Sequence, residues 1–163
     1  MDVRPCEERD LAQLNDLYNH YVLSTPITFD IDPITMNQRR EWFAGFSTDG
    51  PHRLLIALDG ERVLGYAQSK AFRPKAAYET TVETTIYVLD GEHGRGVGSS
   101  LYSALFSALD GQDLHRAFAG ITQPNEASVA LHRRFGFTQI GVFGEVGRKF
   151  DRYWDVAWYE KAL

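Results

Sequence analysis

The chain has 163 residues, of which 44% are hydrophobic and 24% are charged, and its formal net charge is −5. This length and composition are typical of a single globular domain with its own core, which we expect to cover residues 1–163. The acidic balance argues against a nucleic-acid-binding protein, and the lone Cys6 excludes an intramolecular disulfide and a multi-cysteine metal site, so we expect neither nucleic acid nor metal. The charged N-terminus lacks a signal-peptide core and no apolar run approaches the roughly 20 residues of a membrane span, so the expected location is cytoplasmic, away from membranes.

The first half of the chain predicts two helices followed by a β-hairpin. Its elements are expected in this order: an edge strand at Val3–Arg4, a helix over 8–23, a loop over 24–33, a second helix over 34–46, and strands over 53–58 and 62–72. Thr35 is a suitable N-cap for the second helix. The Asp59-Gly60 pair between the two strands is a strong hairpin signal.

The second half alternates strands and helices and closes on another hairpin. The expected elements are a strand over 81–88, a helix ending near Leu109, a strand over 115–122, a helix over 125–135, and strands over 137–146 and 153–160. Gly136 follows the last helix at a position that favours a left-handed backbone. This order predicts a mixed α/β (α+β) sheet with helices on both faces.

The stretch Thr81–Ser99 carries the clearest chemical pattern. Its strand alternates with a period of two, and Gly94, Gly96 and Gly98 then expose the backbone just before a helix. Backbone amides at the positive end of a helix suit a phosphate group. Such a loop also occurs as a strand-to-helix turn that binds nothing. A Rossmann loop is disfavoured because the third glycine is missing, and a P-loop is excluded because no Gly-Lys-Ser/Thr is present.

Two sequence motifs then resemble the acetyl-CoA-binding pattern of the GNAT N-acetyltransferase superfamily: GEHGRGVGSSL and, about thirty residues later, NEASVALHRRFGF. Three further segments, YNHYV, AYETTVETTIYV and GRKFDRYWDVAWYEK, are similar to the phosphinothricin acetyltransferase group. The resemblance implies a mostly antiparallel sheet of about six or seven strands. It also implies a homodimer that moves the acetyl group of acetyl-CoA to the primary amine of a small amino-acid analogue.

The resemblance also assigns residues to the cofactor. They are Ile86, Tyr87 and Val88 on the strand, His93, Gly94, Arg95, Gly96, Val97, Gly98 and Ser99 in the loop, and Asn125 on the later helix. The strand end is expected to pair with the pantetheine arm, to diverge from the next strand, and to offer an oxyanion-stabilising amide near Val88. His93 departs from the family pattern, which has Gln or Arg at that position.

Two residues are the expected catalytic groups. Glu83 matches the glutamate of the group's pattern and is the candidate general base, although a lone strand Glu is more often a solvated charge. His132 lies seven residues after Asn125, so both share one helix face, and it stands where the wider superfamily has a tyrosine that protonates the thiolate. It could act as that acid or assist Glu83, and the alternative is a surface helix histidine.

The acceptor pocket is expected to involve Phe29, Arg73, Tyr78 and Lys149, although most of the aromatic candidates could equally belong to the core. Glu79 stands where the resembling enzymes often have Arg, which weakens the specific expectation of phosphinothricin and leaves room for a less anionic or a cationic acceptor. Two other functions remain open. One is acetylation of a different small amine or a peptide amine, and the other is a non-catalytic CoA-binding domain.

Overall fold

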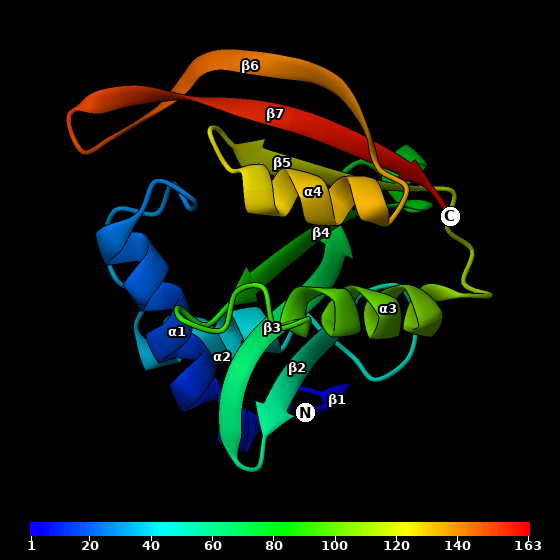
Figure 1. The fold of residues 1–163 in the computed structure, drawn as a ribbon. Coiled ribbons are helices and arrows are strands. Elements are labelled where there is room, and N and C mark those ends of the chain that lie inside the picture. Colours follow the sequence, from blue (N-terminus) through cyan, green and yellow to red (C-terminus); the bar gives the residue numbers. More distant parts are fainter.

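The computed structural model describes residues 1–163 and contains one seven-stranded sheet with four helices (Figure 1). The strand order is β1-β2-β3-β4-β5-β7-β6, and only β4 and β5 are parallel. The strands are β1 (Asp2–Pro5), β2 (Leu54–Asp59), β3 (Arg62–Ala71), β4 (Thr81–Val88), β5 (Arg116–Thr122), β6 (Thr138–Lys149) and β7 (Arg152–Ala162). The helices are α1 (Leu11–Ser24), α2 (Met36–Phe43), α3 (Val97–Leu109) and α4 (Glu126–Arg134). The expected mixed, mostly antiparallel sheet is confirmed.

Helices cover both faces of the sheet, as predicted, because the central strands β2 and β3 bury successive apolar side chains on both sides. On one face α3 buries Leu101 and Leu105 against Val82 of β4, and α4 packs against the same cluster. On the other face α1 buries Leu11 and Leu14 beneath α2. Each fully buried leucine contributes about 1.5–3 kcal/mol to folding. None of the helices is long and apolar enough to cross a membrane.

The two parallel strands at the centre of the sheet separate along their length. They pair only where Thr81, Val82 and Glu83 of β4 face residues 116–118 of β5. Beyond this point β4 stays paired with β3 up to Val88, while β5 stays paired with β7 up to Thr122. The sheet therefore opens into a V, which is the divergence that the family resemblance implied.

Local signals placed most element ends well, with two exceptions. The second helix was expected over 34–46, but α2 covers only Met36–Phe43 because residues 44 and 45 form a turn. Thr35 caps α2 by accepting a hydrogen bond from the Gln38 amide at 3.3 Å, and the Asp59-Gly60 turn joins β2 to β3. The final hairpin is longer than expected. Its turn residues Phe150 and Asp151 both have positive φ, at 53° and 56°, so a tight turn forms where the sequence offers no glycine.

Candidate active site

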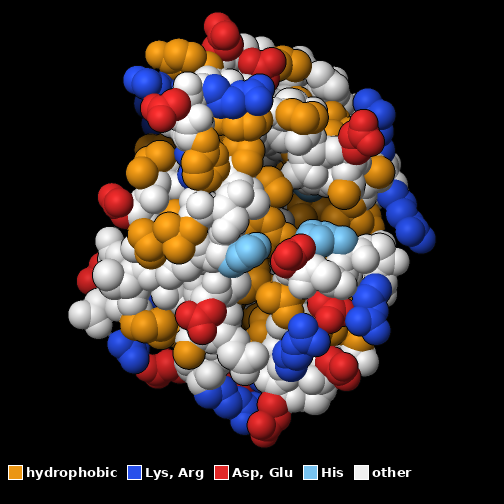
Figure 2. Space-filling model, turned by 60° about the vertical axis from the view of Figure 1, so that its left-hand side comes forward, with side chains coloured by type: hydrophobic (Ala, Val, Ile, Leu, Met, Phe, Trp, Pro, Cys, Tyr) orange, Lys and Arg blue, Asp and Glu red, His pale blue; other side chains and the backbone are white.

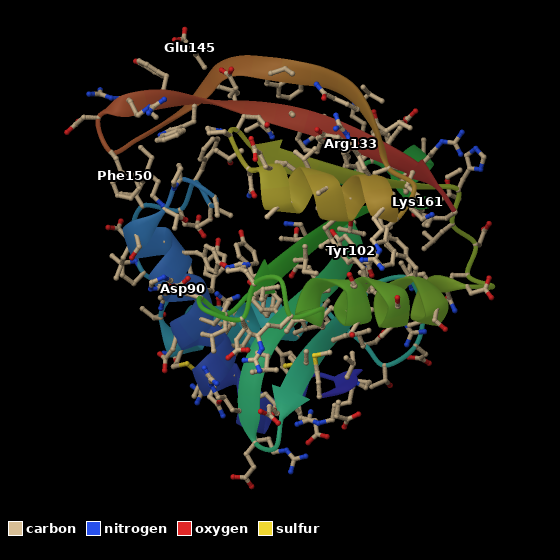
Figure 3. The ribbon with its side chains drawn as sticks, viewed as in Figure 1. Asp90, Tyr102, Arg133, Glu145, Phe150 and Lys161 are labelled. Atoms are coloured by element: carbon tan, nitrogen blue, oxygen red, sulfur yellow. The ribbon has the colours of Figure 1, made fainter.

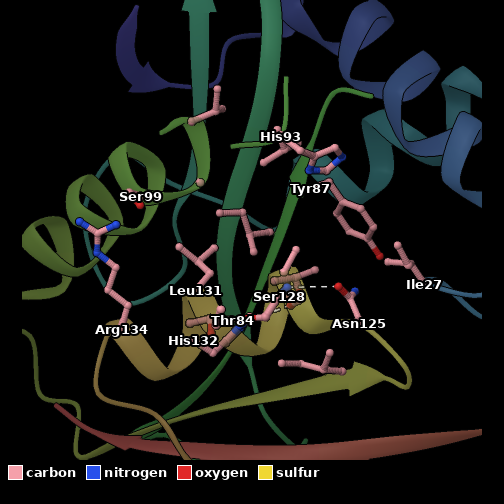
Figure 4. A pocket seen from close by; sticks show the side chains of 18 of the residues that line it. Ile27, Thr84, Tyr87, His93, Ser99, Asn125, Ser128, Leu131, His132 and Arg134 are labelled. Carbon is pink, nitrogen blue, oxygen red and sulfur yellow. Dashed lines mark hydrogen bonds between the residues drawn. The ribbon is translucent and has the colours of Figure 1, made fainter. Parts of the chain in front are cut away.

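A cavity of about 450 Å³ occupies the opening between β4 and β5. In the space-filling view it is a hollow with hydrophobic side chains inside it and histidine side chains beside it (Figure 2). Its wall residues include eleven of those assigned from the sequence: Ile86, Tyr87, Val88, His93, Gly94, Gly96, Val97, Gly98, Ser99, Asn125 and His132. Segments more than forty residues apart in sequence therefore meet around one space (Figure 4).

The N-terminus of α3 forms one end of this cavity. Gly96 is its N-cap residue and has φ of 85°, a left-handed conformation that glycine adopts without strain. No side chain caps the helix and its first turn holds no acid. The amides of Val97, Gly98 and Ser99 lack intrahelical acceptors, so this end can bind a phosphate group.

Helix α4 supplies the opposite wall, and its own capping orients Asn125. The Asn125 side-chain oxygen accepts a hydrogen bond from the Ser128 amide at 3.1 Å, shown as a dashed line in Figure 4. The side-chain amide NH₂ of Asn125 then remains available to an acceptor in the cavity. A pantetheine arm carries amide carbonyls that fit such a donor.

His132 is buried, with only 3% of its surface exposed, so it is not a surface helix histidine. Its Nδ1 lies 2.7 Å from the Ser128 carbonyl oxygen, which can only accept, so Nδ1 carries the hydrogen. Its Nε2 lies 2.8 Å from the Tyr102 hydroxyl, which therefore donates to the neutral imidazole. Burial lowers the pKa of His132, which keeps this arrangement neutral. Figure 3 shows Tyr102 between α3 and α4.

Tyr21 of α1 reaches the end of β4 and meets the residue that departs from the family pattern. Its hydroxyl donates to the Val88 carbonyl oxygen at 2.5 Å and lies 3.2 Å from His93 Nε2. Burial raises the pKa of Tyr21 to about 12, so the hydroxyl stays protonated. His93 thus links the glycine loop to α1 through its side chain.

Glu83 lies on β4 outside the wall of the cavity, on the sheet face that carries Thr85 and Tyr87. Its direct strand neighbours are Lys70 on β3 and Phe118 on β5. The carboxylate is half-buried and forms no ion pair within 4 Å. Thr85, two residues further along β4, does line the cavity, so Glu83 is about 7 Å from it along the strand.

The four expected acceptor residues also lie outside the cavity wall, and they form two groups. Phe29 packs against Gly147 of β6, and Lys149 Nζ donates to the Thr28 carbonyl oxygen at 2.9 Å. Burial lowers the pKa of Lys149, although Asp30 opposes this shift. The second group is Arg73 and Tyr78 on the exposed connection between β3 and β4.

Sequence reasoning missed several residues around the site. No sequence motif marks Tyr21 as a partner of Val88 and His93, or Tyr102 as the partner of His132. Glu92 lines the cavity and is held by two arginines, Arg62 and Arg95. The only sequence signal for Glu92 was its spacing of three residues from Arg95, which is common on any surface.

Comparisons with known proteins agree with this architecture. The model of the acetyltransferase (GNAT) domain family matches residues 3–158. A phosphinothricin N-acetyltransferase of Streptomyces coelicolor is 59% identical over 100% of this chain and 96% of its own length. A methionine sulfoximine/methionine sulfone acetyltransferase of Pseudomonas paraeruginosa is 35% identical over 99% of this chain and 94% of its own length.

Solved structures give the same result for the fold. An acetyltransferase of Salmonella typhimurium with acetyl-CoA superposes with a TM-score of 0.94 at 30% identity, covering 100% of this chain and 94% of its own. A phosphinothricin acetyltransferase of Sinorhizobium meliloti with acetyl-CoA gives 0.91 at 30% identity, covering 99% and 88%. The fold is that of a GNAT acetyltransferase. The chain belongs to the acetyltransferase (GNAT) family and is an acetyl-CoA-dependent N-acetyltransferase.

The cavity suits the two chemically different halves of acetyl-CoA. The α3 end offers backbone donors for phosphates, and the V between β4 and β5 leaves the edge of β4 unpaired beyond Glu83. An extended amide chain can hydrogen-bond to such an edge as a further strand would. The thioester would then lie between β4 and α4, within the part of the cavity lined by Thr84, Thr85 and His132.

Proposed function

We propose that this enzyme transfers the acetyl group of acetyl-CoA directly to the primary amine of a small amino-acid-like acceptor of the phosphinothricin or methionine sulfoximine type. The observation that carries the proposal is the V between β4 and β5. An acetyl-CoA thioester held in this opening could be reached by an amine from the sheet face on which Glu83 lies. The names of the relatives at 59% and 35% identity support this class of acceptor.

Glu83 is proposed as the general base. An ammonium group must lose a proton before its nitrogen can attack the thioester carbonyl, and a carboxylate without an ion-pair partner can accept that proton. Because Glu83 is about 7 Å along the strand from Thr85, we place a water molecule between the carboxylate and the amine. When the amine nitrogen attacks the acetyl carbonyl carbon, negative charge forms on the carbonyl oxygen, and a backbone amide near Val88 would stabilise this oxyanion.

Replacing Glu83 with Gln tests this role. We expect turnover near pH 7 to fall by about 10²-fold or more, because proton removal then depends on bulk water. The difference in turnover between the wild type and Glu83→Gln should become smaller as pH rises above the pKa of the acceptor amine, since the attacking amine is then already neutral. A pH–rate profile of thiol release measures both effects. Glu41→Gln on α2 is the control for loss of one carboxylate far from the cavity. A profile for Glu83→Gln that matches this control would remove Glu83 from the role.

The acceptor class is tested by a coupled thiol-release assay with the wild-type enzyme. L-phosphinothricin, L-methionine sulfoximine and L-methionine sulfone are compared with polyamines, ordinary amino acids and peptides. Glu79 stands where the resembling enzymes often have Arg. We therefore expect L-methionine sulfone, whose side chain is uncharged, to be acetylated at least as fast as phosphinothricin, whose side chain is anionic. Preference for a peptide or polyamine would favour the alternative of another acceptor, and no thiol release with any amine would favour a non-catalytic CoA-binding domain.

We also propose that the enzyme is a cytoplasmic homodimer that uses no metal, and that β6 forms the subunit interface. β6 is an edge strand of 12 residues and carries four exposed apolar side chains: Ile140, Val142, Phe143 and Val146, each about half exposed. Long apolar edges of this kind pair with another chain or aggregate unless they are covered. A second copy of the same strand offers the matching surface.

A further inference from the structure

A buried carboxylate, Glu92, lies in the wall of the cavity just before the glycine loop. Its side chain is only 8% exposed. One carboxylate oxygen accepts a hydrogen bond from Arg62 Nη1 at 3.1 Å and the other accepts from Arg95 Nη1 at 2.8 Å. The three residues, here called the Arg62–Glu92–Arg95 cluster, join the start of β3 to the loop that precedes α3.

An acid at this place is unexpected if it acts alone. The adjacent amides of α3 and the positive end of that helix suit an anion, and a free carboxylate would repel the phosphates of the cofactor. Two guanidinium groups around one carboxylate leave the cluster with a net positive charge. The cluster as a whole therefore attracts the ligand that Glu92 by itself would disfavour.

Both arginines keep hydrogen-bond donors that the contact with Glu92 does not use. Their side chains are 58% and 69% exposed, and each donates one hydrogen bond to Glu92. A guanidinium has five N–H donors in a planar fork that matches phosphate geometry. Neither arginine belongs to the cavity wall itself, but both contact Glu92, which does, so Arg62 and Arg95 keep free donors one residue away from it.

A simple surface ion pair does not explain this geometry. Exposed pairs form between flexible side chains, and neither partner needs to be buried. Here the acid is buried and contacts both cations at once, so it restricts both arginines before any ligand arrives. Groups that are already ordered lose less conformational entropy when they bind.

We propose that Arg62, which lies outside the glycine loop, is a cofactor-binding residue that contacts the phosphates of CoA, and that Glu92 is the positioning residue that holds it there. The inference rests on the use of acetyl-CoA but not on any particular acceptor. It adds to the backbone amides of α3 a side chain from the β2–β3 hairpin, more than thirty residues earlier in the chain.

The test measures the Kd of CoA by isothermal titration calorimetry, which needs no acceptor. We expect Arg62→Ala to raise the Kd about 10-fold or more, the effect of one charge-assisted contact. Arg62→Lys should give an intermediate Kd because it keeps the charge and loses the fork. Arg9→Ala is the matched control, since Arg9 is an exposed arginine whose partner at 2.8 Å, Glu7, is not a residue of the cavity wall, whereas the partner of Arg62 is. Higher salt should reduce the Arg62→Ala effect.

For Glu92→Gln, the direction of the change in the Kd of CoA distinguishes the two possible roles of the acid. If Glu92 positions the arginines, the Kd rises by about 3-fold or more, because a side-chain amide cannot accept from both guanidinium groups with full charge. If Glu92 acts only as a repelling charge, the Kd falls. A Kd for Arg62→Ala within twofold of Arg9→Ala, or a Glu92→Gln Kd equal to or below wild type, would overturn the inference. Absence of acetyl transfer by the wild-type enzyme would instead count against the proposed function.

Discussion

His132 is the residue whose protonation state the fold controls most directly. Burial lowers the pKa of His132 below its ordinary value of 6.5, while in the unfolded chain it titrates at that value. Below about pH 6.5 the unfolded chain therefore binds more protons than the folded one, so stability falls as pH decreases. His132→Gln removes this titration. We expect the wild type to lose more stability than the variant between about pH 7.5 and about pH 5.

Thermal unfolding of both proteins at several pH values measures this difference, because the other acids titrate equally in both and cancel. Parallel Tm curves would show that burial does not set the charge of His132.

The hydrogen bonds of His132 also limit its possible role in catalysis. A neutral His132 with its Nε2 lone pair held by Tyr102 has no proton at Nε2 to give. A role as acid toward the thiolate would require His132 to be protonated first, and its turnover would then fall as pH rises.

Single residues were predictable from sequence when their partners were close in the chain. The seven-residue spacing of Asn125 and His132 predicted that both share one face of α4, and both line the cavity. Tyr102 could not be recognised, because it lies 30 residues away on another helix and its pattern is that of a core aromatic. Glu92 was missed for the same reason, since its contact with Arg62 joins the loop before α3 to the start of β3, 30 residues earlier in the chain.

At the scale of elements, the loop between α1 and α2 is held against the β6–β7 hairpin. Phe29 packs on Gly147 so closely that a Cβ atom built on this glycine would overlap the ring. We expect Gly147→Ala to displace Phe29 and to raise the KM for the acceptor about threefold or more, with an unchanged KM for acetyl-CoA. The reason is that Phe29 is one of the residues expected in the acceptor pocket and is not among those expected to bind the cofactor.

Gly141→Ala is the matched control for this substitution. It lies on the same strand, and a Cβ atom there meets nothing within 4 Å. Steady-state kinetics with L-methionine sulfone as acceptor measures both KM values. Equal acceptor KM values for the two variants would show that Phe29 does not form part of the acceptor site. A rise in the acetyl-CoA KM alone would assign the loop to the cofactor instead.

Element types followed from periodicity, and element ends followed from turn chemistry where that chemistry was present. The alternation in β4 and the glycines before α3 predicted a strand, a loop and a helix in the correct order. The end of β6 was predicted too early and the start of β7 too late, because Phe150 and Asp151 adopt positive φ without a glycine. Tertiary contacts, such as the Lys149 bond to Thr28, accompany this turn and leave no local sequence signal.

At the scale of the whole molecule, the order of elements along the chain predicts which strands form but not their order in the sheet. The final hairpin was predicted, but its strands enter the sheet in the order β5-β7-β6, so the last strand lies inside and β6 becomes the edge. Sequence alone could not decide between the two strands, because both alternate and either could pair with β5. The separation of β4 from β5, which creates the cavity, came only from the family resemblance.

The two edges of this sheet are very different, and this difference predicts the assembly. β1 is four residues long and ends at Pro5, so it offers little to a second chain. β6 is three times longer, and its Val142 is 49% exposed. We expect the wild type to have twice the chain mass of 18.5 kDa in multi-angle light scattering. Val142→Lys should weaken this dimer at least about 10-fold, because burying two ammonium groups across a two-fold axis costs more than about 1.4 kcal/mol.

Leu23→Lys provides the comparison for that experiment, since Leu23 of α1 is an equally apolar residue, 59% exposed, and lies on a different surface. The same charge added there should leave the mass unchanged. A wild-type mass equal to one chain at all concentrations would show that β6 is not a subunit interface. A dimer that survives Val142→Lys but not Leu23→Lys would move the interface to α1, and the exposed side chains of β6 would then need another explanation, such as contact with the acceptor.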